Sequence, residues 1–362
     1  MEEKYTLPAY PQSTDMWEEL RRLDRPIVVY GMGNGADKLF DRLEKYGIKP
    51  ADIFASDGFV RGHSFRGMRV KSFSEIKEAY PDFVILLSFA SNRPEVIDML
   101  RNIDREYDML VPDMPVADTG EYFDKDFYNE HYEEIKSAYG ALSDEKSKRL
   151  FSLIIRYKLS GRMEYLMEYH SSPIDIFRSL PIEKIKTFVD VGAYNGDTLR
   201  LALEAFPSLS SAICIEPDPK TFRRLLKYCD TVTDIEIKTV MGALGDENSR
   251  GVLLCAGNRN STVSATSSYE FKSTEIEVIT LDSLTASPDF IKYDVEGEEY
   301  KALLGSCETI SKYRPVLLVS LYHRSRDMFE LINYLHKEYP DYKLSLKRGY
   351  CLPAWEIDLI LT

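Results

Sequence analysis

The stretch Phe188-Val-Asp-Val-Gly-Ala-Tyr-Asn-Gly-Asp-Thr198 reads as an apolar strand, a turn with two glycines and the start of a helix. Gly192 lets the backbone approach a ligand closely. Asp190 and Asp197 place carboxylates beside that approach, which suits a ligand with ammonium or hydroxyl groups better than one with phosphates. The stretch therefore predicts an α/β domain that binds its ligand just after this strand.

A second carboxylate follows the next expected strand, which ends in Ile213-Cys-Ile-Glu-Pro217. An acid at the carboxyl end of the second strand of such a fold accepts both hydroxyls of a ribose. Taken alone, Glu216 could equally be a surface turn residue. Because the glycine turn and Glu216 follow consecutive strands, together they favour a nucleoside ligand.

A third charged segment is Asp289-Phe-Ile-Lys-Tyr-Asp-Val-Glu-Gly-Glu-Glu-Tyr300. Strand alternation puts Lys292, Asp294 and Glu296 on one side of what should be a buried strand. Charged side chains do not stay buried without partners, so these either pair with one another or face a cleft at the edge of the sheet. We favour the cleft, with a structural Lys292–Asp294 pair as the alternative.

Alternating strands and helices predict two doubly wound, Rossmann-like α/β sheets joined by a helical segment. We expect an N-terminal domain at 1–117, a helical linker at 118–182 and a C-terminal domain at 183–362. The linker either packs the two domains together or forms the face of a homodimer. A polar stretch at 257–274 is either a surface insert or a lid. The expected strands are 27–30, 53–56, 83–88, 188–191, 212–215, 236–240, 252–255, 277–279, 290–295, 316–321 and 357–361, and the principal helices are 36–45, 74–79, 198–205 and 220–228.

Composition excludes several classes of protein. The 362 residues carry a net charge of −13, which argues against a nucleic-acid partner, whose phosphates need a basic surface. No apolar run reaches the ~18 residues of a membrane span, and the start of the chain lacks the apolar core of a signal peptide. The five cysteines include no C-x-x-C pair and read as reduced thiols. We therefore expect a cytoplasmic protein.

Residues 187–323 resemble the FkbM-type S-adenosylmethionine-dependent methyltransferases. The resemblance rests on the motifs Val189-Asp-Val-Gly-Ala-Tyr-Asn-Gly-Asp-Thr198, Ile215-Glu-Pro217, Ala243-Leu-Gly-Asp246, Ile279-Thr-Leu-Asp-Ser-Leu284, Ile291-Lys-Tyr-Asp-Val-Glu-Gly-Glu298 and Arg314-Pro-Val316. It implies a class I methyltransferase fold, S-adenosyl-L-methionine as cofactor, and O-methylation of a hydroxyl on a sugar, glycan or related small molecule. The cofactor-binding residues that it implies are Asp190, Gly192, Ala193, Asn195, Gly196, Asp197, Glu216, Pro217, Gly242, Ala243, Leu244 and Asp294.

Methyl transfer to a hydroxyl is an in-line displacement that needs an aligned acceptor and removal of its proton. His323, just beyond an expected strand, is the best single base on pKa grounds, with a surface histidine as the alternative. Asp294 is the competing base, and Lys292 would orient the hydroxyl. Two carboxylates, Asp294 and Glu296, make a thin case for a divalent cation, so no metal is expected.

The N-terminal part carries a glycine motif of its own, Tyr30-Gly-Met-Gly-Asn-Gly-Ala36, which matches G-x-G-x-x-G/A after a strand. The motif belongs to a longer pattern, Ile27-Val-Val-Tyr-Gly-Met-Gly33, Ala55-Ser-Asp-Gly58, Arg66-Gly-Met-Arg-Val70 and Asp82-Phe-Val-Ile-Leu86. This pattern looks like the nucleotide-sugar-binding domain of bacterial sugar acyltransferases. The alternatives are an NAD-dependent oxidoreductase, a non-catalytic nucleotide-sugar sensor, or a domain kept for packing. The second ligand site would comprise Gly31, Gly33, Asn34, Gly35 and Asp57.

Overall fold

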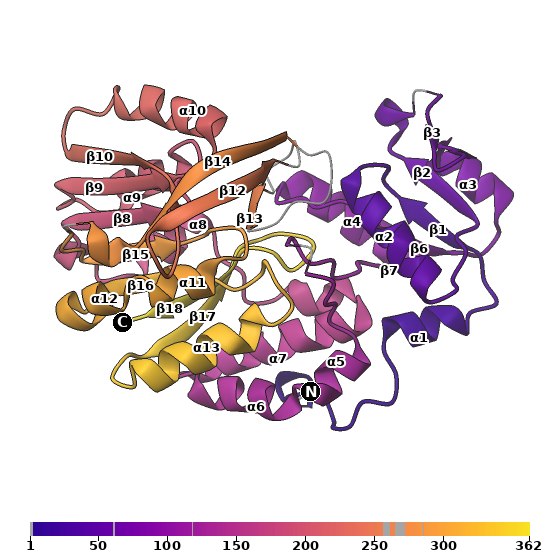
Figure 1. Cartoon of the computed structure of the whole chain (residues 1–362). Helices are drawn as coiled ribbons and strands as arrows, with labels where there is room; N and C mark the ends of the chain where they lie inside the picture. Colours follow the sequence, from indigo (N-terminus) through magenta and orange to yellow (C-terminus); the bar gives the residue numbers. More distant parts are fainter. Residues whose placement is uncertain (1–2, 61, 118, 256–260, 265–271, 285) are drawn as a thin grey trace.

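The computed structural model describes residues 3–60, 62–117, 119–255, 261–264, 272–284 and 286–362. Figure 1 shows the two principal β-sheets, one formed by the N-terminal part of the chain and one by the C-terminal part. Most helices of the intervening segment lie at the bottom centre of this view, below the C-terminal sheet. The predicted class, two α/β sheets joined by helices, is confirmed.

The N-terminal sheet has five parallel strands in the order β5-β2-β1-β6-β7. Its strands are β1 (Ile27–Tyr30), β2 (Asp52–Ala55), β5 (Lys71–Ser72), β6 (Val84–Leu87) and β7 (Asp108–Leu110), with a separate hairpin of β3 (Ser64–Phe65) and β4 (Met68–Arg69). Side chains of α1 (Met16–Arg21) and α2 (Asn34–Lys45) cover one face, and those of α3 (Phe73–Ala79) and α4 (Pro94–Glu106) cover the other. The expected strands β1, β2 and β6 are confirmed within one residue at each end.

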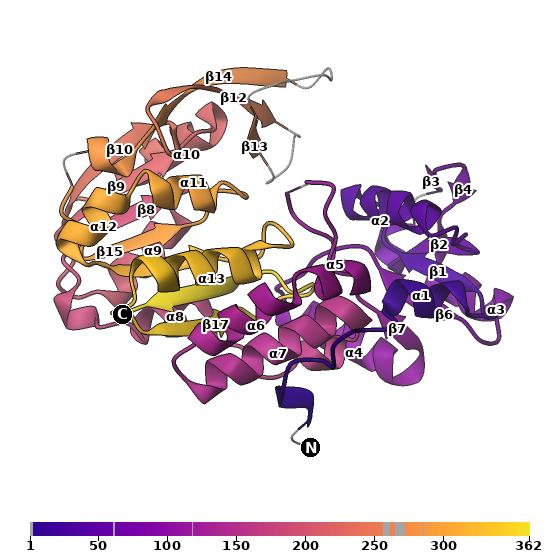
Figure 2. The same cartoon turned by 60° about the horizontal axis from the view of Figure 1, so that its bottom comes forward.

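The intervening segment is helical. It contains α5 (Lys125–Glu130), α6 (Tyr132–Ala141), α7 (Glu145–Ser160) and α8 (Pro173–Arg178), with short 3₁₀ turns at Met163–Leu166 and Ile182–Lys184. Gly161 ends α7 in the left-handed conformation, with φ at 66°. Helix α6 packs against α13 (Asp327–Glu338), and α7 against β17 (Leu344–Arg348). Figure 2 shows α6 and α7 in front of the C-terminal sheet.

The C-terminal sheet has seven strands in the order β10-β9-β8-β15-β16-β18-β17. The strands are β8 (Thr187–Val191), β9 (Ser211–Glu216), β10 (Glu236–Met241), β15 (Phe290–Tyr293), β16 (Val316–Ser320), β17 and β18 (Ile357–Leu361). Strand β18 runs antiparallel to both of its neighbours, and the other pairs are parallel. Residues of α8, α9 (Asp197–Ala205) and α10 (Pro219–Cys229) pack on one face, and residues of α11 (Glu299–Leu304), α12 (Cys307–Tyr313) and α13 on the other.

Two of the expected strands do not belong to this sheet, which corrects the sequence-based topology. The strands expected at 252–255 and 277–279 lie in β12 (Ser249–Cys255) and β14 (Lys272–Ile279). These join β11 (Ala243–Leu244) and β13 (Ser261–Ser264) in a separate four-stranded sheet of order β11-β14-β12-β13. Most of the polar stretch at 257–274, interpreted as a lid or an insert, lies outside the described residues.

One apolar cluster runs through the whole molecule. It joins side chains of β1 and β6, of the helices α5–α7, and of β8, β15 and β16. The N-terminal sheet is therefore packed, through the helical segment, onto the same core as the C-terminal sheet. Among the described cysteines, Cys214, Cys229, Cys307 and Cys351 are free thiols. In the described part of the chain, no helix combines the length and apolar character that crossing a membrane requires.

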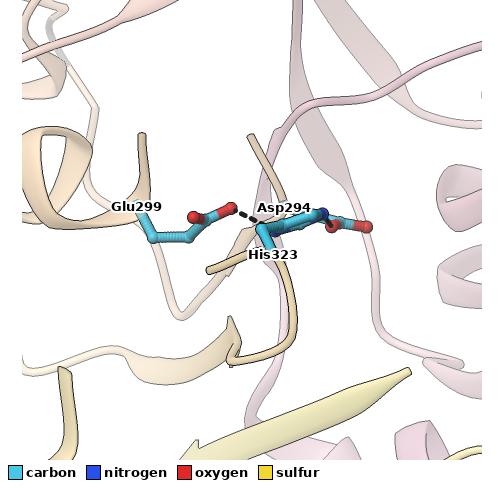
Figure 3. A group of neighbouring side chains, drawn as sticks. All are labelled: Asp294, Glu299 and His323. Atoms are coloured by element: carbon cyan, nitrogen blue, oxygen red, sulfur yellow. Dashed lines mark ion pairs between the residues drawn. The ribbon is translucent and has the colours of Figure 1, made fainter. Parts of the chain in front are cut away.

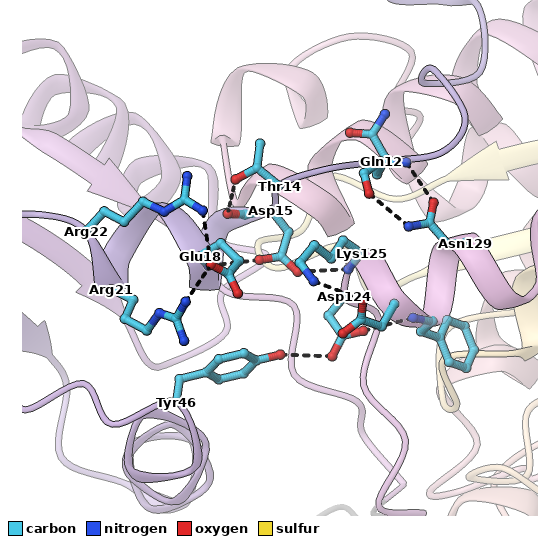
Figure 4. A network of polar contacts seen from close by, with 12 residues as sticks. Gln12, Thr14, Asp15, Glu18, Arg21, Arg22, Tyr46, Asp124, Lys125 and Asn129 are labelled. Atoms are coloured by element: carbon cyan, nitrogen blue, oxygen red, sulfur yellow. Dashed lines mark hydrogen bonds and ion pairs between the residues drawn. The ribbon is translucent and has the colours of Figure 1, made fainter.

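A polar network holds the helical segment to the N-terminal part (Figure 4). Asp124 caps α5, since its Oδ1 accepts a hydrogen bond from the Phe127 N–H at 2.9 Å. Its Oδ2 lies 2.7 Å from Nη2 of the buried Arg42 and accepts a hydrogen bond from the Tyr46 hydroxyl at 2.9 Å. One carboxylate thus neutralises a buried cation of α2 and starts a helix of the intervening segment.

Replacing Asp124 by Ala leaves the Arg42 guanidinium buried without its charge partner and removes a helix cap. We expect Asp124→Ala to lower the free energy of unfolding by about 3 kcal/mol, measured by urea denaturation. Asp126→Ala is the matched control, because that side chain is 82% exposed on the same helix, and should change stability by less than about 0.5 kcal/mol. Equal effects of the two substitutions would contradict this account of the network.

Candidate functional site

A cleft of about 1530 Å³ opens at the carboxyl ends of β8, β9 and β15. Strand β8 lies between β9 and β15, so the chain reverses the direction in which it adds strands at this point. Ligands of open α/β sheets bind at such a reversal. The volume exceeds the roughly 300–1,000 Å³ of a typical small-molecule site. The cleft therefore has room for two ligands side by side.

Gly192 brings the backbone of the first loop against that of the neighbouring loop. Its φ is +86°, and a Cβ at this position would lie 1.9 Å from the carbonyl oxygen of Asp294. The Gly192 and Ala193 N–H groups both donate to the carbonyl of Ile215, and the Asp294 N–H donates to that of Val191. Only glycine fits this position, and the contact fixes the floor of the cleft.

Glu216 lies in the wall of the cleft and is held by the backbone. Its Oε2 accepts a hydrogen bond from the Tyr194 N–H at 3.0 Å, and its Oε1 accepts one from the Asp218 N–H at 2.9 Å. Burial raises the pKa of Glu216 to about 7, although these two hydrogen bonds act in the opposite direction. Each oxygen keeps a second lone pair, so the carboxylate is prepared to accept two vicinal hydroxyls.

The sequence left open whether Lys292 and Asp294 pair with each other or face a cleft, and in the structure they do both. The Lys292 ammonium lies 2.7 Å from Oδ2 of Asp294, so the two side chains are paired, and both also line the cleft. Lys292 is the register partner of Asp190 on β8. Asp190 is fully buried, and neither of its oxygens has a hydrogen-bond partner among the described residues. Burial raises its pKa to about 7.

His323 lies behind the wall of the cleft and not at the protein surface. The residue is 1% exposed, and it is not among the residues that line the cleft. Its Nδ1 lies 2.9 Å from Oε1 of Glu299, and its Nε2 lies 3.4 Å from Oδ1 of Asp294 and 3.7 Å from Oε2 of Glu296. Burial lowers the pKa of His323, but the three carboxylates outweigh it and raise the pKa to about 10. The alternative interpretation as a surface histidine is wrong.

Two acids of the last strand region, Glu356 and Asp358, also line the cleft and were not identified from the sequence. Burial raises the pKa of Asp358 to about 8, because the carboxylate lies near other acids in an enclosed site. The sequence did contain a signal, since Asp358 is the one charged residue in the strand Ile357-Asp-Leu-Ile-Leu361. Carboxylates thus surround the Lys292 side of the cleft.

Most of the residues predicted to bind the cofactor line the cleft. Those that line it are Gly192, Asp197, Glu216, Pro217, Gly242, Ala243, Leu244 and Asp294. Four others do not line it, namely Asp190, Ala193, Asn195 and Gly196. A Cβ at Gly196 would lie 2.5 Å from the Tyr228 ring, so this glycine serves the packing of α10 against the loop. The lining residues that sequence reasoning missed include Tyr194, Asp218, Tyr322, Glu356, Asp358 and Tyr350.

Two glycines of the N-terminal glycine loop have a structural explanation in the packing of that loop. A Cβ at Gly31 would lie 2.6 Å from Oγ of Ser88, and one at Gly35 would lie 2.1 Å from the Ser88 carbonyl oxygen. These two glycines therefore let the start of α2 approach the end of β6. None of the five residues predicted for a second site, Gly31, Gly33, Asn34, Gly35 and Asp57, lines the large cleft.

Comparison with protein families adds to this geometry. Residues 190–350 match the Methyltransferase FkbM domain. The match confirms the resemblance noted in the C-terminal part and extends it beyond residue 323. Residues 190–350 are therefore similar to a methyltransferase domain of the FkbM type. No match is found among curated proteins. The resemblance of the N-terminal part to sugar acyltransferases stays a prediction.

Solved structures show how far the fold extends. The crystal structure of a methyltransferase FkbM from Methylobacillus flagellatus KT aligns with 99% of this chain and 95% of its own, at 20% identity and a TM-score of 0.70. The whole chain, including the N-terminal sheet, thus shares its fold with that protein. A precorrin-6y C5,15-methyltransferase from Geobacter metallireducens aligns with 54% of this chain and 92% of its own, at 11% identity and a TM-score of 0.34. That likeness is too weak to support an argument.

The Gly192 contact can be tested directly. We expect Gly192→Ala to lower the free energy of unfolding by about 3 kcal/mol or more, since it adds a backbone clash to a strained φ. Gly47→Ala is the control, because Gly47 also has a positive φ of +67° but nothing within 4 Å of the added Cβ. It should cost about 1 kcal/mol, as measured by urea denaturation. Equal losses would show that the positive φ alone, and not the close contact with Asp294, requires glycine at position 192.

Proposed function

We propose that the chain is an S-adenosylmethionine-dependent O-methyltransferase that acts on a hydroxyl of a sugar, glycan or related small molecule. The observation that carries the proposal is a single cleft with two different halves. One half joins the Gly192 loop to Glu216, and the other is lined by Lys292 and several carboxylates. The first half suits a nucleoside cofactor, and the second half suits an acceptor that carries hydroxyl groups.

The residues of the first half fit the cofactor. Glu216 would accept the two ribose hydroxyls, the turn at 242–244 would border the adenine, and Gly192 and Asp197 would lie beside the methionine part. When bound, S-adenosylmethionine supplies a methyl group on a sulfonium, which is a good leaving group. The amino group and the sulfonium are both cationic, and the acid-rich wall complements them.

The second half would orient the acceptor. Among the three predicted catalytic residues, Lys292 and Asp294 line the cleft and His323 does not. We therefore propose that Lys292 and Asp294 contact the acceptor hydroxyl, and that His323 is a positioning residue that acts through Asp294. Carboxylates such as Glu356 and Asp358 accept hydrogen bonds from the other hydroxyls of a sugar. Correct alignment with the methyl group would supply much of the rate enhancement.

The N-terminal part contributes to the same cleft. Asn92 and Pro94, at the start of α4, line it. Backbone hydrogen bonds between Ser91 and Leu352, at 2.7 and 2.9 Å, tie this corner to the C-terminal part. These contacts support a role in enclosing the acceptor. Binding of a nucleotide sugar at the Gly31 loop, a homodimer, a cytoplasmic location and domain limits at 117 and 183 also stay proposals.

Cofactor binding and its pH dependence test the first half. We expect the wild type to bind S-adenosylmethionine or S-adenosylhomocysteine in calorimetry, and Glu216→Gln to weaken binding about 10- to 100-fold, since a charged acceptor is lost. Only ionised Glu216 accepts both hydroxyls fully. Its pKa of about 7 therefore predicts that wild-type affinity falls as the pH drops from 8 to 6, whereas the variant shows little change.

Glu236→Gln is the matched control, because Glu236 is exposed at the far end of β10. It should bind like the wild type at every pH. Absence of binding by the wild type would refute a role for this cofactor. Equal affinities for Glu216→Gln and the wild type would remove Glu216 from the site.

The acceptor class can be tested with S-adenosylmethionine that carries a labelled methyl group. We expect label to enter hydroxyl oxygens in a panel of sugars and glycosides, detected by mass spectrometry, and not their amino groups. Lys292→Met should lower the rate at least about 100-fold while leaving cofactor affinity within about threefold of the wild type, because Lys292 and its ion-pair partner Asp294 both lie in the acceptor half. Transfer to nitrogen or carbon, with no O-methyl product, would contradict the proposal.

A further inference from the structure

The imidazole of His323 is enclosed by three carboxylates. Asp294 and Glu296 lie on its Nε2 side, at 3.4 and 3.7 Å, and Glu299 lies on its Nδ1 side, at 2.9 Å. Figure 3 shows Asp294 and Glu299 at opposite sides of the ring. Even a protonated imidazole neutralises only one of these three charges. The pairing of Asp294 with Lys292 still leaves an excess of negative charge in this enclosed place.

The distances on the Nε2 side are too long for hydrogen bonds. Hydrogen bonds from a ring N–H to an oxygen measure about 2.7–3.2 Å. Among the described residues, neither ring nitrogen of His323 has a partner with hydrogen-bond geometry, although the side chain is 99% buried. Two ligands that each lie about 2.1 Å from one cation are separated by roughly 3–3.5 Å, close to the observed spacing.

Glu299 holds the other side of the ring. It is 1% exposed, and its Oε1 accepts hydrogen bonds from the N–H groups of Val295 at 2.8 Å and Gly297 at 3.4 Å. A fixed carboxylate beside Nδ1 keeps a proton on that nitrogen, so a cation at Nε2 has to displace only the proton on Nε2. Metal-binding histidines commonly have such a carboxylate on the other nitrogen.

The turn that brings these carboxylates to His323 has a strained backbone conformation. Glu296 has a φ of +54°, which is uncommon for a residue with a side chain, and Gly297 follows with a φ of +101°. This tight turn directs Asp294 and Glu296 to one side of the His323 ring and begins the helix that carries Glu299. Strained backbone of this kind is concentrated at functional sites.

We propose that Nε2 of His323, together with carboxylate oxygens of Asp294 and Glu296, binds one divalent cation, with Glu299 as the group that positions the ring. Two carboxylates and one imidazole suit a divalent transition-metal ion such as Mn²⁺, with solvent or substrate oxygens completing the shell. The sequence pointed to Asp294 and Glu296 alone, because His323 and Glu299 meet them only in the fold.

The cation would lie at the wall of the acceptor half, since Asp294 and Glu296 line the cleft. There it would contact an acceptor oxygen and favour loss of its proton. This role rests on the proposed methyl transfer. Binding of the cation does not rest on it, because every ligand named comes from the protein. The two claims can therefore fail separately.

The test is titration of the full-length, chelator-treated protein with Mn²⁺, followed by electron paramagnetic resonance. We expect one equivalent to bind, with echo modulation from a directly bonded ¹⁴N. Glu296→Gln should weaken binding at least about tenfold while the nitrogen signal remains in the bound fraction. His323→Gln should abolish the nitrogen signal. Glu299→Gln should keep the nitrogen signal but lower the affinity about 10- to 100-fold.

His336→Gln and Glu308→Gln are the controls, because both side chains are exposed on nearby helices, and they should bind like the wild type. Circular dichroism checks the folding of each variant, and Glu296→Gln keeps the test decisive should His323→Gln not fold. Absence of Mn²⁺, Mg²⁺ and Zn²⁺ binding by the wild type at millimolar concentration would overturn the proposal. So would bound Mn²⁺ without a nitrogen signal, or an affinity that Glu296→Gln leaves unchanged.

Discussion

The contact between Gly192 and the Asp294 carbonyl determines how the rest of the site is arranged. It joins the loops after β8 and β15, two neighbouring strands whose connections run in opposite directions from the centre of the sheet. Because these loops touch through backbone atoms, Asp294 reaches the cleft beside the glycine turn and at a distance from Glu216. The cleft therefore has a half for a nucleoside and a half for a second reactant.

Excess negative charge is the second constraint on this site. Carboxylates outnumber cationic side chains among the residues that line the cleft, and two acids of this region, Glu216 and Asp190, are buried. Burial raises the pKa of Glu216 and Asp190 to about 7 and that of Asp358 to about 8, which shows that the charged forms lack sufficient partners. A cationic cofactor and a bound metal ion would both supply the missing positive charge. The chemistry proposed for the two halves thus follows from one electrostatic requirement.

Much of the fold follows from local patterns. The glycine turn, the apolar runs of β1, β6, β8 and β16, and the helix end at Gly161 were all predictable, since each depends on residues adjacent in sequence. Strands β5 and β7 have only two and three residues, too few for a pattern. The separate sheet formed by β12 and β14 depends on contacts between distant segments, which the alternation of strands and helices cannot show.

The site residues also divide into those that were predictable from local sequence and those that were not. Gly192, Glu216 and Asp294 follow strands at positions where the sheet fixes their location, so the sequence identified them. Sequence alone could not show that His323 is enclosed by three carboxylates, because Glu299 approaches it from the start of a helix whose position depends on tertiary packing. Likewise, the loop that carries Gly31 and Gly35 matches a ligand-binding pattern through Gly31, Gly33 and Ala36, but in the structure Gly31 and Gly35 lie against Ser88.

The most direct test of the account is a crystal structure of the protein soaked with S-adenosylhomocysteine and Mn²⁺. The account predicts the ribose hydroxyls on Glu216, the thioether sulfur between the Gly192 loop and Lys292, and a cation on Nε2 of His323. A ligand bound in any other place, at the Gly31 loop for example, with the cleft filled only by solvent, would contradict it.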